Sequence, residues 1–131
     1  MDKIKVDIKK INDIINSSDF DYDCETPEYK RSAKFCNAFN RMMKKLFPEC
    51  EIFGCVGYCE VAGFIKNSEG KVIYYSTEDY RWPFMGKSIW DSILYRTADH
   101  VKDFRGGSNN YSDIEHLRDN VLKLFSKMEV K

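Results

Sequence analysis

The chain has 131 residues, and its 21 basic and 21 acidic side chains give a formal net charge of zero at pH 7. Domains that bind nucleic acid through bulk electrostatics usually carry a basic excess, so this balance argues against that class without excluding a local basic patch. A chain of this length suits one domain and buries roughly two-thirds of the surface that its unfolded form exposes. We therefore predict a single domain over residues 1–131 that holds its core without disulfides or metal.

The cysteines of the chain indicate a reducing compartment. Their number is odd, and no apolar leader segment precedes them. No stretch reaches the roughly 18 apolar residues of a membrane-spanning helix. We expect a cytoplasmic protein with free thiols and no membrane contact. The cysteine spacings match no common zinc site, and no phosphate-loop or dinucleotide motif occurs, so we expect no metal and no cofactor. The cysteines are Cys24, Cys36, Cys50, Cys55 and Cys59.

The first segment has the periodicity of a helix. Ile4, Ile8, Ile11 and Ile15 recur at steps of three and four residues, with lysines between them. We expect this helix to end shortly after its last isoleucine and the acidic stretch over residues 19–25 to form a loop.

A second helix has a clear start and end. Thr26 is the expected N-cap and Pro27 the first helical residue, where the missing N–H costs nothing. Pro48 ends the helix. Its basic side chains favour either a solvated face or a phosphate-binding face. The expected buried stripe is Phe35, Phe39, Met42 and Leu46. The basic residues are Arg31, Lys34, Arg41, Lys44 and Lys45.

From Cys50 the pattern changes to period two, and we expect one strand that continues to Ile65. The turn residues 67–70 then lead to an antiparallel return strand over residues 71–76. Gly54 and Gly63, together with Gly57, suggest a bulge, a bend or a close approach by another backbone.

Two later segments are less regular. Pro83 restricts residues 78–83 to an edge strand or a loop. Residues 88–98 favour a further strand, with a helical turn over residues 87–91 as an alternative. We expect a capping box formed by Ser112 and Glu115 to start the last helix. Its expected apolar stripe is Ile114, Leu117, Val121, Leu124 and Met128, widened by Leu122 and Phe125.

This order of elements predicts the α+β class. Strands that follow one another through short turns pair antiparallel, so we expect an antiparallel sheet of about four strands. Two N-terminal helices and one C-terminal helix would pack on it. With the helices on one face, the other face would be partly exposed and its aromatic side chains would form a contact surface.

The polar stretch from Arg96 to Tyr111 is the expected site, because loops held between regular elements often carry function. Three readings stay open. Its glycine pair and the following helix N-terminus favour anion binding. His100 beside an aspartate favours acid–base catalysis. Alternatively, the stretch is a structural connection. The candidate binding residues are Arg96, His100, Lys102, Arg105, Asn109 and Tyr111, with Arg81 and Trp82 nearby.

The same stretch resembles a signature of small proteins that phages, plasmids and conjugative elements of Gram-positive bacteria carry. The matching pattern is Arg96-Thr97-Ala98, His100, then Lys102-Asp103-Phe104, the Gly106-Gly107 pair and Asn109. The resemblance covers roughly residues 58–112. It implies the context of a mobile element, whose accessory genes often encode inhibitors of host defence, including anti-CRISPR proteins.

The leading hypothesis is therefore a binding module and not an enzyme. It would be a mobile-element accessory protein that binds and inhibits a host defence or nucleoprotein effector in the manner of an anti-CRISPR protein. The expected partner is a host protein or ribonucleoprotein, with nucleic-acid contact left open. The alternative is a small enzyme that acts on nucleic acid or a nucleotide, with His100 as acid–base.

Overall fold

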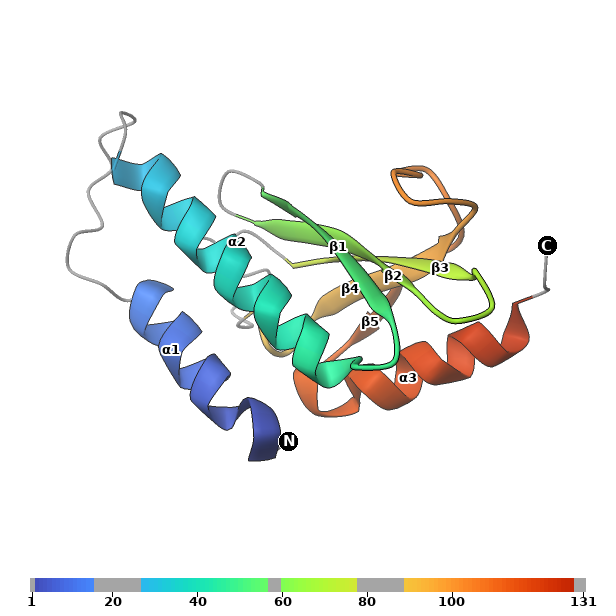
Figure 1. Ribbon diagram of the computed structural model, residues 1–131, viewed down its shortest axis with the longest axis horizontal. Coiled ribbons are helices and arrows are strands. Elements are labelled where there is room, and N and C mark those ends of the chain that lie inside the picture. Colours follow the sequence, from blue (N-terminus) through green and yellow to red (C-terminus); the bar gives the residue numbers. More distant parts are fainter. Residues whose placement is uncertain (1, 16–26, 57–59, 78–88, 129–131) are drawn as a thin grey trace.

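The computed structural model describes residues 2–15, 27–56, 60–77 and 89–128. The helices are η1, a short 3-10 turn (Asp2–Ile4), α1 (Lys5–Ile15), α2 (Pro27–Leu46) and α3 (Ile114–Lys127). The strands are β1 (Glu51–Val56), β2 (Val61–Lys66), β3 (Val72–Ser76), β4 (Ile93–Ala98) and β5 (Asn110–Ser112). Figure 1 shows α2 and α3 lying across the sheet, with α1 beside α2.

The five strands form one antiparallel sheet in the order of the sequence, β1-β2-β3-β4-β5. This arrangement confirms the predicted α+β class and the predicted positions of the helices, with five strands where about four were expected. The predicted hairpin is β2 and β3, joined by a turn in which the Asn67 side chain accepts the N–H groups of Glu69 and Lys71.

The prediction of one continuous strand from Cys50 to Ile65 is wrong. This region contains two strands, β1 and β2, which pair with each other so that Gly54 lies opposite Gly63. The period-two pattern is the same on both sides of the reversal, so the pattern does not locate it. Residues 57–59 at the reversal, including Gly57 and Cys59, lie outside the described part of the chain.

The helices α2 and α3 pack on one face of the sheet, which we call the inner face, and α1 packs against α2. The predicted stripes of α1 and α2 point into this core: Ile11 in α1 and all four stripe residues of α2 are buried. In α3 the buried stripe contains Phe125, whereas Leu122 is exposed. The buried core residues of the sheet include Val61, Ile65, Ile73, Tyr75, Ile93 and Tyr95.

The two paired glycines make room for a buried tyrosine. A Cβ on Gly63 would lie 2.4 Å from Tyr75 Oη, and a Cβ on Gly54 would lie 2.1 Å from Asn40 Nδ2. Above them, the Tyr75 hydroxyl donates a 2.6 Å hydrogen bond to Asn40 Oδ1 in α2. Burial raises the pKa of Tyr75, so its hydroxyl stays a donor. The predicted close approach at Gly63 is therefore made mainly by a side chain that links the sheet to α2.

The start of α3 differs from the prediction. Its N-cap is Asp113, whose carboxylate accepts the N–H of His116, so the expected Ser112–Glu115 capping box is not the one that forms. Ser112 belongs to β5 and donates to the Asp113 carbonyl oxygen. An aspartate at the N-cap satisfies a free N–H as well as a serine does, and the pairing of β5 decides between the two.

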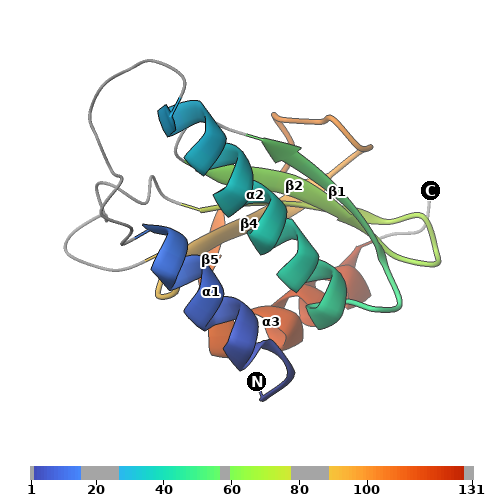
Figure 2. The same ribbon diagram turned by 60° about the vertical axis from the view of Figure 1, so that its left-hand side comes forward.

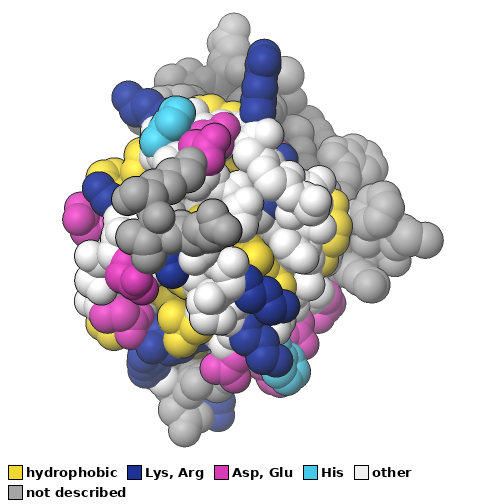
Figure 3. Space-filling model, turned by 90° about the vertical axis from the view of Figure 1, so that its right-hand side faces the viewer, with side chains coloured by type: hydrophobic (Ala, Val, Ile, Leu, Met, Phe, Trp, Pro, Cys, Tyr) yellow, Lys and Arg dark blue, Asp and Glu magenta, His cyan; other side chains and the backbone are white. Residues whose placement is uncertain are grey.

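None of the described helices combines the length and the apolarity that crossing a membrane requires. The side of the molecule seen in Figure 3 carries basic and acidic side chains interspersed with small hydrophobic areas. This mixture matches the balanced overall charge of the sequence.

Candidate functional site

The face of the sheet opposite the helices, which we call the outer face, carries a row of large side chains. The strand register aligns Phe53, Phe64, Tyr74 and Arg96 across β1, β2, β3 and β4. Because side chains alternate along a strand, all four point to the same side. The Phe64 and Tyr74 rings pack with centroids 5.3 Å apart. Cross-strand aromatic pairs of this kind stabilise a sheet and fix its register.

The chain between β4 and β5 folds back over this row. Phe104 packs edge-on against both rings, with centroid distances of 5.3 Å to Phe64 and 5.9 Å to Tyr74. Phe64 is fully buried although it lies on the outer face. A small second core results, completed by Val72 and Ala98. Figures 1 and 2 show this connection projecting from the sheet well away from α1.

Arg96 holds this connection in place. Its guanidinium donates to the Phe104 carbonyl oxygen and, at 3.2 Å, to Asn109 Oδ1. The guanidinium carbon also lies 4.6 Å from the centroid of the Tyr74 ring, within cation–π range. Its Nε is buried and has no acceptor in the described chain, and burying an N–H group without an acceptor costs free energy. The two hydrogen bonds and the contact with the Tyr74 ring must offset that desolvation cost. Arg96 is therefore an anchor within the protein.

Asp103 organises the first half of the connection. Its carboxylate accepts the backbone N–H of Asp99 at 2.8 Å and that of Arg105 at 3.0 Å. These two hydrogen bonds lower the pKa of Asp103. A turn closed by the Asp103 N–H and the His100 carbonyl oxygen places Lys102 at a φ of 79°. Asp103 thus fixes the backbone of the connection through these hydrogen bonds.

The glycine pair lets the second half of the connection lie against β4. A Cβ on Gly106 would lie 2.4 Å from the Thr97 carbonyl oxygen, and one on Gly107 would lie 2.2 Å from Thr97 Oγ1. Gly107 also has a positive φ of 33°. The two glycines therefore allow the connection to pack closely against Thr97 and allow the backbone to adopt a positive φ.

The predicted site residues do not all come together. Arg96 and Asn109 are joined by a hydrogen bond, whereas His100, Lys102 and Arg105 have exposed side chains. The His100 Nδ1 lies 2.8 Å from the Val101 carbonyl oxygen, which accepts a hydrogen bond from the ring when the proton is on Nδ1. The remaining predicted residues are Tyr111, exposed in β5, and Arg81 and Trp82, which lie outside the described residues.

Aromatic side chains on the outer face form a second set of functional candidates. The sequence predicted an aromatic contact surface on the open face and Tyr111 as a binding residue, whereas Phe53 and Phe104 were not among the predicted binding residues. Among the described residues, the three exposed aromatic side chains are Phe53, Phe104 and Tyr111, with 36%, 51% and 56% of their surface accessible. All three lie on the outer face or on the connection that covers it. The alternation of β-strands could have identified Phe53 if β1 had been recognised as a separate strand, whereas Tyr74 already lies on the predicted return strand over residues 71–76.

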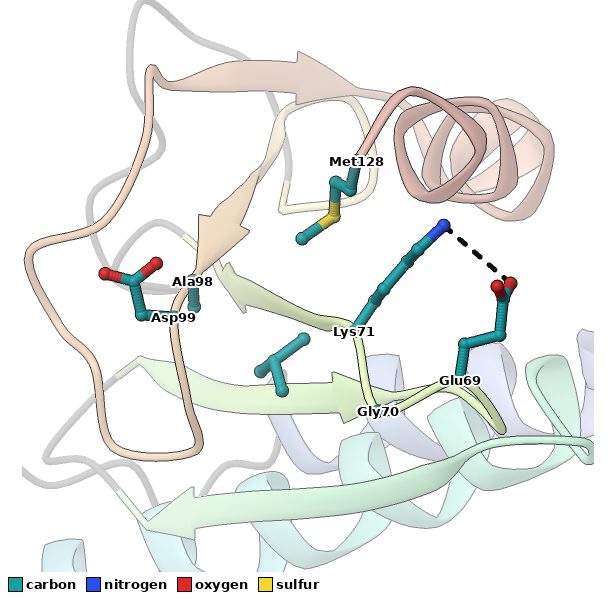
Figure 4. Close-up of a pocket in the computed structure, with 7 residues that line it drawn as sticks. Glu69, Gly70, Lys71, Ala98, Asp99 and Met128 are labelled. Atoms are coloured by element: carbon teal, nitrogen blue, oxygen red, sulfur yellow. Dashed lines mark ion pairs between the residues drawn. The ribbon is translucent and has the colours of Figure 1, made fainter. Parts of the chain in front are cut away.

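A small hollow of about 150 Å³ lies beside the connection, between the β2–β3 turn and the end of α3 (Figure 4). Lys71 dominates it: its Nζ donates to the Phe125 carbonyl oxygen at 3.1 Å and lies 3.7 Å from the Glu69 carboxylate. The Asp99 carboxylate points away from Lys71. A lysine near the C-terminal end of a helix stabilises the carbonyl groups that lack a partner within the helix. The position of Lys71 in this hollow is therefore explained by its contact with the end of α3.

Comparison of the chain with protein-family models, with curated proteins and with solved structures finds no match. The described residues also contain no group of three or more histidine, cysteine or acidic side chains placed to hold a metal ion. The described cysteines are free thiols: Cys36 is buried, and Cys50 and Cys55 are half-buried. What this chain can bind is therefore inferred from its own surfaces.

Proposed function

We propose that this chain is a protein-binding module whose outer sheet face docks on a host protein. The observation that supports this function is the set of exposed aromatic side chains, Phe53, Phe104 and Tyr111, on the face that the helices leave open. Aromatic residues and arginine are enriched in the cores of protein interfaces, where charged residues are depleted. Exposed rings gathered on one face are the kind of surface that a partner covers.

The geometry of this face favours a macromolecule over a small ligand. Phe53 lies on the first strand of the sheet and Tyr111 on the last, so four strand spacings of about 4.8 Å separate them, or roughly 19 Å. The half-buried Tyr74 and Leu94 lie between them, and Phe104 stands above. A partner that covers all of these needs a broad surface, which a protein provides.

The anchoring of the connection supports binding without large rearrangement. Arg96 and Asp103 fix the backbone on both sides of Phe104, so this ring is held in place before a partner arrives. A preorganised side chain loses less conformational entropy on binding. The resemblance to mobile-element proteins gives the proposal its biological form: an accessory inhibitor of a host defence effector, of the anti-CRISPR type, acting in the cytoplasm.

The experiment measures CRISPR interference in a bacterium that restricts a plasmid carrying a target sequence. Expression of the chain should restore transformation, and the purified protein should bind the effector complex in calorimetry. The Phe104→Ser/Tyr111→Ser variant should lose affinity. Interface hot spots are worth about 2 kcal/mol or more each, so roughly a thousandfold loss is expected for two.

A matched control removes two exposed apolar side chains from the helical side. Val6 in α1 and Leu122 in α3 are exposed, and the Val6→Ser/Leu122→Ser variant should bind as the parent does. Because Phe104 also packs on Phe64, the single Tyr111→Ser variant is tested with it. Equal binding by all variants, or full restriction in the presence of the parent chain across the CRISPR types tested, would refute the proposal.

A further inference from the structure

A second surface, on the helical side of the molecule, has a chemistry of its own. Between α1 and α2 lies a hollow of about 400 Å³. Figure 2 shows these two helices side by side, away from the connection between β4 and β5. The residues that line the hollow are Lys10 and Ile14 from α1 and Lys34, Asn37 and Arg41 from α2.

The charges of this hollow are uncompensated within the described chain. Lys10, Lys34 and Arg41 are exposed and form no ion pair with a described residue, and no carboxylate of the described residues lines the hollow. Further along the same two helices, by contrast, Lys45 of α2 forms an ion pair with Asp7 of α1 at 3.0 Å. Three cations around one hollow repel one another, and an anion that enters it relieves that repulsion.

The basic residues extend beyond the hollow as a stripe. Lys34, Asn37, Arg41 and Lys44 follow one another at steps of three, four and three residues, which places them on one side of α2. At 1.5 Å per residue the stripe is about 15 Å long. A single phosphate cannot reach both ends of such a stripe, whereas an extended chain of phosphates can.

We propose that this hollow and its stripe bind the phosphate backbone of a single nucleic-acid strand. Arg41 can hold a phosphate through two parallel hydrogen bonds. Lys10 approaches from the opposite helix, and the Asn37 amide supplies an uncharged donor. These contacts carry no base recognition, so binding is independent of sequence. The site is separate from the outer sheet face, and a nucleoprotein partner would meet both.

The test uses the purified full chain with fluorescein-labelled single-stranded RNA and DNA of mixed sequence, read by fluorescence anisotropy. Each phosphate neutralised contributes roughly −0.7 to the slope of log affinity against log salt. The Lys10→Gln/Lys34→Gln/Arg41→Gln variant should therefore make that slope shallower by about 2 and should bind weakly at every salt concentration.

The matched control removes three exposed lysines elsewhere, in Lys3→Gln/Lys123→Gln/Lys127→Gln, with the same change in net charge. It should keep the parent slope. An equal loss in both triple variants, or no binding by the parent at low salt, would overturn the proposal. So would displacement of the strand by ATP or inorganic phosphate at equal phosphate concentration, since the hollow would then suit a small anion. None of these results depends on the protein partner of the outer face.

Discussion

Replacing Arg96 should release the connection between β4 and β5 without unfolding the sheet. The guanidinium makes two hydrogen bonds, to the Phe104 carbonyl oxygen and to Asn109 Oδ1, and stacks on Tyr74. A hydrogen bond to a charged group is worth about 1.5–3 kcal/mol and an exposed cation–π contact about 0.5–1 kcal/mol. Because Arg96 is only half-buried, solvent screens part of this. We expect Arg96→Ala to destabilise the closed connection by about 2–3 kcal/mol.

Hydrogen exchange measured by NMR reports this opening directly. Three amides in the connection are hydrogen-bonded: those of Asp99, Asp103 and Arg105. A loss of 2–3 kcal/mol corresponds to exchange that is roughly 30- to 150-fold faster for these amides. The amides of β2 should exchange as in the parent.

Two further variants separate anchoring from charge. Arg96→Lys keeps the charge but lacks the planar fork, so its exchange rates should lie between those of the parent and Arg96→Ala. Arg105→Ala removes an exposed arginine whose side chain forms no hydrogen bond or ion pair with the described residues, and it should leave the rates unchanged. Parent-like exchange in Arg96→Ala would refute the assignment of Arg96 as an anchor.

Three other predictions concern the fold around the site. Gly63→Ala should lower the free energy of unfolding in urea by about 2 kcal/mol, because Tyr75 must move away from the new Cβ. Much of this loss should vanish when Tyr75 is replaced by leucine. If the losses from the two substitutions simply add, the clash with Tyr75 is not the cause. The pKa of Asp103 is lower in the folded protein than its ordinary value, so Asp103 stabilises the fold above the ordinary aspartate pKa. This stabilisation is lost as the pH falls through the lowered pKa. The Arg105 amide resonance should follow the same titration, and a midpoint at or above the ordinary pKa would contradict the prediction. Asp113→Ala should cost about 1 kcal/mol in thermal unfolding, and no change would mean that another residue caps α3.

The helices could be predicted well because their signals are local. The 3.6-residue period of Ile11 in α1 and of Phe35, Phe39 and Met42 in α2 identifies the buried sides, and all four residues are buried. Pro48 indicates the end of α2 within two residues.

The strands at the two edges of the sheet were harder to predict. The reversal between β1 and β2 leaves no break in the alternation, and Gly54 looks unfavourable in a strand until its contact with Asn40 is known. β5 has only three residues, Asn110–Ser112, and pairing with β4 alone defines it. Such non-local pairing has no counterpart in a local pattern.

The arrangement of the candidate site residues could not be predicted from the sequence. The stretch after β4 does carry Phe104 and leads to Tyr111, but its charged residues were expected to act together. Arg96 instead faces a carbonyl oxygen and an amide of the same chain, while Arg105 faces solvent. Which cation turns inward depends on strand register, since Arg96 lies opposite Tyr74.

Photocrosslinking tests the binding role of the outer sheet face most directly. A benzoylphenylalanine placed at Tyr111, on the outer face, and another placed at Leu122, on the helical side, report which surface touches a partner in the cell. The account predicts a discrete crosslinked product with a host effector subunit from position 111 and none from position 122. Crosslinking from position 122 alone, or the same products from both positions, would contradict it.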